Sequence, residues 1–127
     1  DIVNQDEKEA GVRRKLNFGH TFGHAFERIT GAAHGEAVSA GMMVAADLSG
    51  KRGLLSRSEI GRLKGLLDRL NLPTALPVDH ARAMDALRKD KKRQGDTIHF
   101  VLLDGLGRAV VEPLTLSELD RETRELL

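Results

Sequence analysis

Apolar residues recur at helical spacing in the first informative part of the chain. Between residues 13 and 30, Phe22, Phe26 and Ile29 follow one another in steps of four and three positions. This spacing places side chains on one face of an α-helix. Residues 13–30 are therefore predicted to form a helix that buries this apolar stripe.

Small residues indicate where the chain packs closely. Gly19 and Gly23 each lower the helix propensity of the first segment by about 1 kcal/mol. Two glycines four positions apart on one face allow another backbone or a ligand to come close. After a short loop, residues 36–53 are small or apolar without a clean polar face, which predicts a buried helix that ends near Gly50 to Gly53.

Two capping-box sequences of the type Ser/Thr-x-x-Glu predict further helices. The first occupies residues 56–59, and the amphipathic helix that it begins stops before Pro73. The second occupies residues 115–118 and begins a final helix that reaches Leu127. Both predictions rest on the side chain and the backbone of the same short segment, so they do not depend on the rest of the fold.

The period of the apolar residues changes towards the C-terminus. Asp79 stands at the N-cap of a predicted helix that ends near Gly95. The sequence then predicts two strands, at residues 97–103 and 109–112, joined by a turn at 104–107. This segment predicts a β-hairpin, the only strand signal in the sequence.

Composition supports a mainly helical fold. Of the 127 residues, 40% are hydrophobic but only 3% are aromatic, with four Phe and no Tyr or Trp. Such an aliphatic core is typical of helices packed on helices rather than of β-sandwiches. We therefore expect a mainly α fold with one small β-hairpin, and the sequence shows no internal repeat or domain boundary.

Net charge and cysteine content exclude several classes of function. Twenty Lys and Arg oppose nineteen Asp and Glu, for a formal charge of +1, so neither nucleic acid nor an anionic membrane is an expected partner. No apolar run approaches the roughly 18 residues of a membrane span. The absence of cysteine excludes disulfides, thiolate metal sites and cysteine nucleophiles, and it is consistent with a cytoplasmic location.

Two histidines lie four positions apart in the first predicted helix. His20 and His24 therefore share one helix face, with β-carbons about 6 Å apart, and both rings can reach one ion or ligand. Thr21 stands where the metalloprotease sequence HExxH has its glutamate, so a metalloprotease is not predicted. The alternative is that the two rings only pack or form hydrogen bonds between helices.

A third histidine follows at the start of the next predicted helix. His34 can fold back towards the first pair, and Glu27 or Glu36 can add a carboxylate, which makes a metal site a reasonable hypothesis. The alternative is that His34 and Glu36 only cap the helix.

Basic residues form two short clusters, residues 13–15 and residues 91–93. Arginine binds phosphate or carboxylate with a bidentate fork, and lysine binds as a point charge. Each cluster is therefore a candidate anion-binding site. The alternative is a solvated charged face, which is the common role of such runs.

Taken together, these motifs resemble the C-terminal domain of the 3-dehydroquinate synthases. The resemblance is carried by Arg13-x-x-x-Asn17-Phe-Gly-His20-Thr-Phe-Gly-His24, by His34-Gly-Glu36-Ala-Val and by Asp90-Lys-Lys92. It covers nearly the whole chain and implies a helical metal- and substrate-binding domain. It also implies a shikimate-pathway lyase that converts 3-deoxy-D-arabino-heptulosonate 7-phosphate to 3-dehydroquinate and phosphate, with NAD and a zinc or cobalt ion as cofactors.

The resemblance also implies roles for individual residues. It implies that His20 and His34 bind the metal and that His24 contacts the substrate near its phosphate, with a catalytic role. The remaining implied site residues bind the anionic substrate or act on it: Arg13, Asn17, and one of Lys91 and Lys92. With these roles, Glu27 and Glu36 are no longer candidate metal ligands.

The resemblance further implies that residues 1–127 are part of a longer enzyme. Family members have an N-terminal NAD-binding domain, and their third metal ligand, a glutamate, precedes the position that matches Asp1. We therefore expect a partial C-terminal domain that is inactive alone, and a cytoplasmic homodimer as the intact enzyme, acting on a phosphorylated sugar acid.

Two other functions stay open at this stage. The chain could come from a related sugar phosphate cyclase that makes deoxy-scyllo-inosose or an epi-valiolone, although Asn17 and His24 together favour dehydroquinate. It could also be a non-catalytic helical module that binds a metal or an anion.

Overall fold

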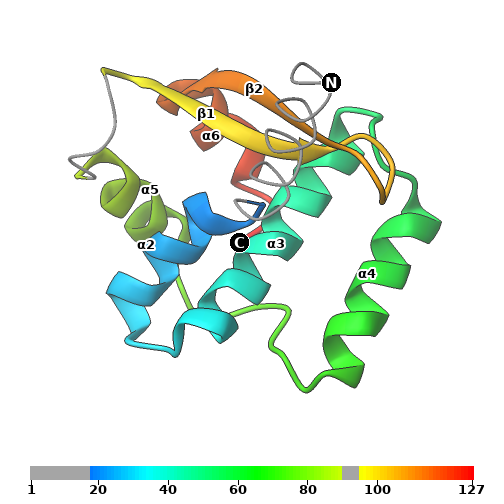
Figure 1. Ribbon diagram of the computed structural model, residues 1–127. Helices are drawn as coiled ribbons and strands as arrows, with labels where there is room; N and C mark the ends of the chain where they lie inside the picture. Colours follow the sequence, from blue (N-terminus) through cyan, green and yellow to red (C-terminus); the bar gives the residue numbers. More distant parts are fainter. Residues whose placement is uncertain (1–17, 90–94) are drawn as a thin grey trace, which may run out of the picture.

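The computed structural model describes residues 18–89 and 95–127 of the chain. Four of the predicted site residues lie outside these ranges: Arg13, Asn17, Lys91 and Lys92. The part that is described is mainly helical, with a single antiparallel hairpin, as the sequence predicts (Figure 1). Its elements, in chain order, are α2 (His20–Thr30), α3 (His34–Lys51), α4 (Arg57–Arg69), α5 (His80–Arg88), β1 (Thr97–Leu103), β2 (Ala109–Thr115) and α6 (Leu116–Thr123).

Helix α3 is the central element of the fold. It packs against α2, α4, β1 and α6, and Ala37, Ala45, Ala46 and Leu48 are completely buried along it. The small alanine side chains let neighbouring elements approach from several sides, and burial on these sides is why the segment lacks a polar face. The prediction of a buried helix that ends close to Gly50 is confirmed, since α3 ends at Lys51.

The β-hairpin covers the core with the buried end of its first strand. Thr97 pairs with Thr115 and Leu103 with Ala109, so the two strands are aligned over their full length. Phe100 is buried, and its ring meets the ring of Phe22 from α2 in an edge-on contact, 6.0 Å between centres. The hairpin is therefore anchored on the same core that holds α2 against α3.

Both predicted capping boxes are confirmed. Ser56 Oγ accepts a hydrogen bond from the Glu59 amide at 3.1 Å, and the Ser56 amide donates to Glu59 Oε1 at 3.1 Å. Thr115 and Glu118 make the corresponding pair of bonds at the start of α6. Asp79 does stand at the N-cap of α5, but its side chain makes no capping hydrogen bond.

The predicted ends of three helices are wrong. Helix α2 begins at His20, whereas the sequence predicts one helix over residues 13–30, because Gly19 has a left-handed backbone with φ of +83°. Helix α5 ends at Arg88, well before Gly95, and α6 ends at Thr123 rather than at the last residue. Within the described residues, none of the helices is long and apolar enough to cross a membrane.

Candidate functional site

A glycine seam, defined as Gly19, Gly23 and Gly41, brings α2 and α3 into backbone contact. A Cβ added at Gly41 would lie 2.6 Å from the Gly23 nitrogen and closer still to the Gly19 carbonyl oxygen. A Cβ added at Gly23 would lie 3.0 Å from the Val38 Cα. Both separations are shorter than van der Waals contact, so side chains at these positions would push the helices apart. The prediction that the glycines admit another backbone is confirmed.

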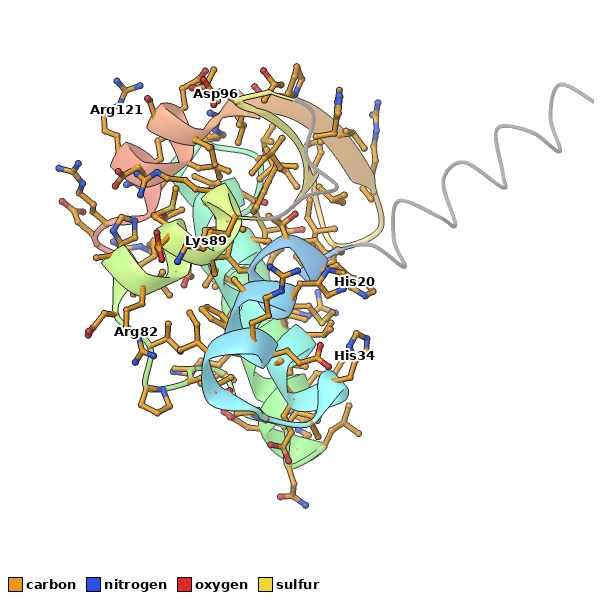
Figure 2. The ribbon with its side chains drawn as sticks, turned by 90° about the vertical axis from the view of Figure 1, so that its left-hand side faces the viewer. His20, His34, Arg82, Lys89, Asp96 and Arg121 are labelled. Atoms are coloured by element: carbon orange, nitrogen blue, oxygen red, sulfur yellow. The ribbon has the colours of Figure 1, made fainter. Side chains whose placement is uncertain are left out.

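The seam and a short loop together create a histidine cluster, defined as His20, His24 and His34. The chain leaves α2 at Gly31, whose amide donates to the Glu27 carbonyl at 2.9 Å, and re-enters a helix at His34 after only two more residues. The ring centres of His20 and His24 are 5.4 Å apart. The ring of His34 lies 5.6 Å from His20 and 6.1 Å from His24. His20 and His34 therefore lie on one side of the molecule (Figure 2).

The three rings differ in exposure. His20 is half-buried, whereas His24 and His34 are exposed. Burial, followed by the nearby charges of His24 and His34, lowers the pKa of His20 below its usual value. The lowered pKa favours the neutral form of His20, which is the form of imidazole that binds metals.

The donor chemistry and spacing of the cluster suit part of a zinc or cobalt site. Two imidazoles that share a tetrahedral zinc ion have ring centres about 5 Å apart, given Zn–N bonds of about 2.0–2.1 Å. The 5.6 Å between His20 and His34 is close to this value. Among the described residues, however, no three metal-binding side chains come close enough together to hold an ion. A complete site would need a further ligand from outside residues 18–89 and 95–127.

The two glutamates that the sequence offered as ligands have different surroundings. Glu27 Oε2 lies 3.0 Å from Nδ1 of His34, so this carboxylate is already engaged by the ring. Glu36 is exposed in the first turn of α3. The predicted positions Arg13, Asn17, Lys91 and Lys92 fall outside the described residues, and their roles remain predictions.

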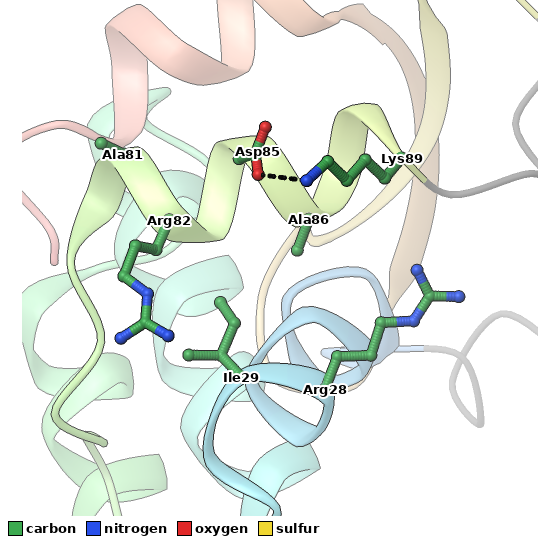
Figure 3. Close-up of a pocket in the computed structure, with 7 residues that line it drawn as sticks. All are labelled: Arg28, Ile29, Ala81, Arg82, Asp85, Ala86 and Lys89. Carbon is green, nitrogen blue, oxygen red and sulfur yellow. Dashed lines mark ion pairs between the residues drawn. The ribbon is translucent and has the colours of Figure 1, made fainter.

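A pocket that the sequence did not predict lies between α2 and α5. Its volume is about 450 Å³, and its lining comprises Arg28, Ile29, Ala81, Arg82, Asp85, Ala86 and Lys89 (Figure 3). Lys89 pairs with Asp85 at 3.0 Å, and the side chains of Arg28 and Arg82 point to opposite sides. The lining residues come from segments about 50 positions apart without a shared motif, so no sequence signal could have found the pocket. It includes none of the three clustered histidines.

Residues 1–93 match the protein family described as 3-dehydroquinate synthase C-terminal. The chain belongs to this family. Among its relatives, the 3-dehydroquinate synthase of Dichelobacter nodosus is 48% identical over 125 residues, which are 94% of this chain and 34% of the relative. The 3-dehydroquinate synthase of Acidithiobacillus ferrooxidans (strain ATCC 53993) is 49% identical over 117 residues, 87% of this chain and 32% of the relative. The chain thus spans about a third of the length of these curated relatives.

Solved structures of related cyclases share the fold of this 3-dehydroquinate synthase C-terminal family member. A 2-deoxy-scyllo-inosose synthase complexed with carbaglucose-6-phosphate, NAD+ and Co2+ matches with a TM-score of 0.71 and 27% identity, over 86% of this chain and 34% of that one. A 2-epi-5-epi-valiolone synthase from Streptomyces hygroscopicus, with NAD+ and Zn2+ bound, matches with a TM-score of 0.71 and 30% identity, over 87% and 32%. The predicted fold class is therefore confirmed.

Proposed function

We propose that this chain forms the metal- and substrate-binding part of a 3-dehydroquinate synthase, a lyase of the shikimate pathway. The intact enzyme would convert 3-deoxy-D-arabino-heptulosonate 7-phosphate to 3-dehydroquinate and phosphate. The observation that carries the proposal is the convergence of His20, His24 and His34 at the meeting point of α2 and α3. Membership of the family supports it independently. A cytoplasmic homodimer belongs to the same proposal.

His20 and His34 are the proposed metal ligands. Their rings have the spacing of two ligands of one ion, and the lowered pKa of His20 keeps its lone pair available. When bound, a divalent zinc or cobalt ion supplies Lewis-acid polarisation of a substrate oxygen. The related cyclases with Co2+ or Zn2+ in their structures support this choice of metals.

His24 is the proposed substrate contact and catalytic residue of the cluster. Its exposed ring lies beside the metal-binding pair, where it can donate a hydrogen bond to an anionic group of the substrate. The other proposed contacts to the phosphorylated sugar acid come from Arg13, Asn17, and one of Lys91 and Lys92. Such fixed contacts orient the substrate and so lower the entropic part of the barrier. NAD would bind to residues outside this chain.

A second candidate is a related cyclase that makes deoxy-scyllo-inosose or an epi-valiolone. The TM-score of 0.71 to both kinds of enzyme keeps this candidate open, since the fold does not separate the three activities. Sequence identity favours dehydroquinate, because it is 48% and 49% with the two 3-dehydroquinate synthases but 27% and 30% with the two solved cyclases.

Calorimetric titration of the chain with zinc tests the metal site. We expect one ion per chain, bound more weakly than by a three-ligand site. His20→Ala or His34→Ala should lower the zinc affinity further, by at least about tenfold. His99→Ala is the matched control, because His99 is an exposed histidine on β1. Equal losses in all three variants would contradict the assignment, and tight binding by the wild-type chain would show that the site is complete.

Phosphate release tests the activity. The product of the complete reading frame should release phosphate from 3-deoxy-D-arabino-heptulosonate 7-phosphate faster than from the substrates of the other cyclases. The 127-residue chain should release none, and His24→Ala in the longer protein should lower kcat/KM. A preference for another sugar phosphate would favour the second candidate, and activity of the chain alone would contradict its expected incompleteness.

A further inference from the structure

We propose that Glu27 is a positioning residue that orients the imidazole of His34 for metal binding, an inference that rests on the proposed function. Its Oε2 lies 3.0 Å from Nδ1 of His34, which is hydrogen-bond distance. The two residues belong to different helices, α2 and α3. The contact therefore joins the histidine that begins α3 to the helix that carries the other two members of the cluster.

Among the described residues, the Glu27 carboxylate is the one hydrogen-bond partner of the His34 ring, which otherwise lies only beside the rings of His20 and His24. His34 is the first residue of α3, and its side chain is 57% exposed. An exposed side chain samples several rotamers, and restricting them costs conformational entropy whenever a metal binds. A hydrogen bond to a neighbouring helix reduces this freedom before the metal arrives.

The hydrogen bond also selects which ring nitrogen carries the proton. An ionised carboxylate only accepts hydrogen bonds, so the neutral His34 ring must hold its proton on Nδ1 to make the contact. The lone pair is then on Nε2, which becomes the nitrogen available to an ion. Histidines that bind metals commonly donate their other N–H to a carboxylate in this way, and the partner raises the basicity of the ligand.

The backbone around the loop keeps Glu27 in place. The Glu27 carbonyl accepts from the Gly31 amide at 2.9 Å, where Gly31 has a left-handed φ of +70°. The Thr30 hydroxyl donates to the Phe26 carbonyl at 2.8 Å and accepts from the Ala32 amide at 3.1 Å. These bonds set the path of the loop from α2 to α3. The distance from Glu27 to His34 is thus set by local structure as well as by the two side chains.

Glu36 provides the matched control. It is also a glutamate close to His34, in the first turn of α3, but it is exposed and forms no hydrogen bond or ion pair with the ring. Replacing it removes the same negative charge from the neighbourhood while leaving the bond between Glu27 and His34 intact. Alanine suits both positions, because it has the highest helix propensity and Glu27 is only half-buried.

Nitrogen-15 NMR of the metal-free chain at about pH 8.5, where histidine is neutral, tests the inference directly. We expect His34 to hold its proton mainly on Nδ1 in the wild-type chain and in Glu36→Ala. In Glu27→Ala it should hold the proton mainly on Nε2. Glu27→Gln retains a hydrogen-bond acceptor and should keep part of the wild-type preference. A His34 tautomer that is the same in Glu27→Ala and in the wild type would overturn the proposal.

Zinc titration of the same variants supplies the second readout. Glu27→Ala should lower the affinity about 10- to 100-fold, the loss usual for such a partner, and Glu36→Ala should change it less than threefold. If His20→Ala leaves zinc binding unchanged, the proposed metal site itself is wrong. If His20→Ala abolishes binding but Glu27→Ala and Glu36→Ala bind equally, only the role of Glu27 is wrong.

Discussion

Replacing Gly41 with alanine should force α2 and α3 apart. The new Cβ would lie 2.6 Å from the Gly23 nitrogen and 3.1 Å from the Gly23 Cα, whereas ordinary carbon contacts lie at about 3.5–4.0 Å. The opposing atoms are backbone atoms, so no side chain can rotate out of the way. We expect the two helices to separate by about 1 Å, with His20 moving away from His34.

The stability effect combines two opposing terms. Overpacking of a close interface costs about 1–3 kcal/mol, and contact with backbone places this site at the upper end. Alanine recovers up to about 1 kcal/mol through its higher helix propensity. We therefore expect Gly41→Ala to lower the free energy of unfolding by about 1–2 kcal/mol, or Tm by about 4–8 °C.

Urea unfolding followed by circular dichroism measures the effect, with Gly61→Ala in α4 as the matched control. A Cβ at Gly61 would have no atom within 4 Å, so this variant gains helix propensity without a clash. It should stabilise the chain by up to about 1 kcal/mol. If Gly41→Ala is as stable as Gly61→Ala, the close approach of α2 and α3 is not what requires glycine at position 41.

Two other variants test local features of the fold. Ser56→Ala removes the capping side chain of α4 and should lower the free energy of unfolding by about 1 kcal/mol in urea denaturation; an unchanged midpoint would mean that the capping bonds contribute nothing. Burial raises the pKa of Asp47, while Lys64 acts in the opposite direction, so at pH values between the ordinary and the raised pKa the folded chain holds a proton that the unfolded chain has already released. Stability should therefore fall as pH rises through the raised pKa, and Asp47→Asn should be more stable than the wild type near neutral pH. This advantage should shrink at pH values below the ordinary pKa of aspartate. Urea unfolding at several pH values measures it. A difference in the free energy of unfolding between Asp47→Asn and the wild type that does not change with pH would mean that burial has no such effect.

Much of the fold was predictable because its signals are local. The stripe of Phe22, Phe26 and Ile29 and the two capping boxes depend on residues within one or two turns of each other, and a helix forms the same short-range contacts in any fold. The change of period that marks the hairpin is local in the same sense. The helix ends were less predictable, because Gly19 leaves the helical conformation where it meets the backbone of α3.

The candidate site was also predictable only where it depends on local signals. The shared face of His20 and His24 follows from helix geometry alone, so the amino-acid order is enough to pair them. The approach of His34 depends on how tightly α2 packs on α3, and the contact between Glu27 and His34 depends on the path of the loop between them. The pocket beside α5 involves still more distant segments. Spacing along the chain specifies neighbours within one helix, whereas contacts between helices exist only once packing has set their distance and angle.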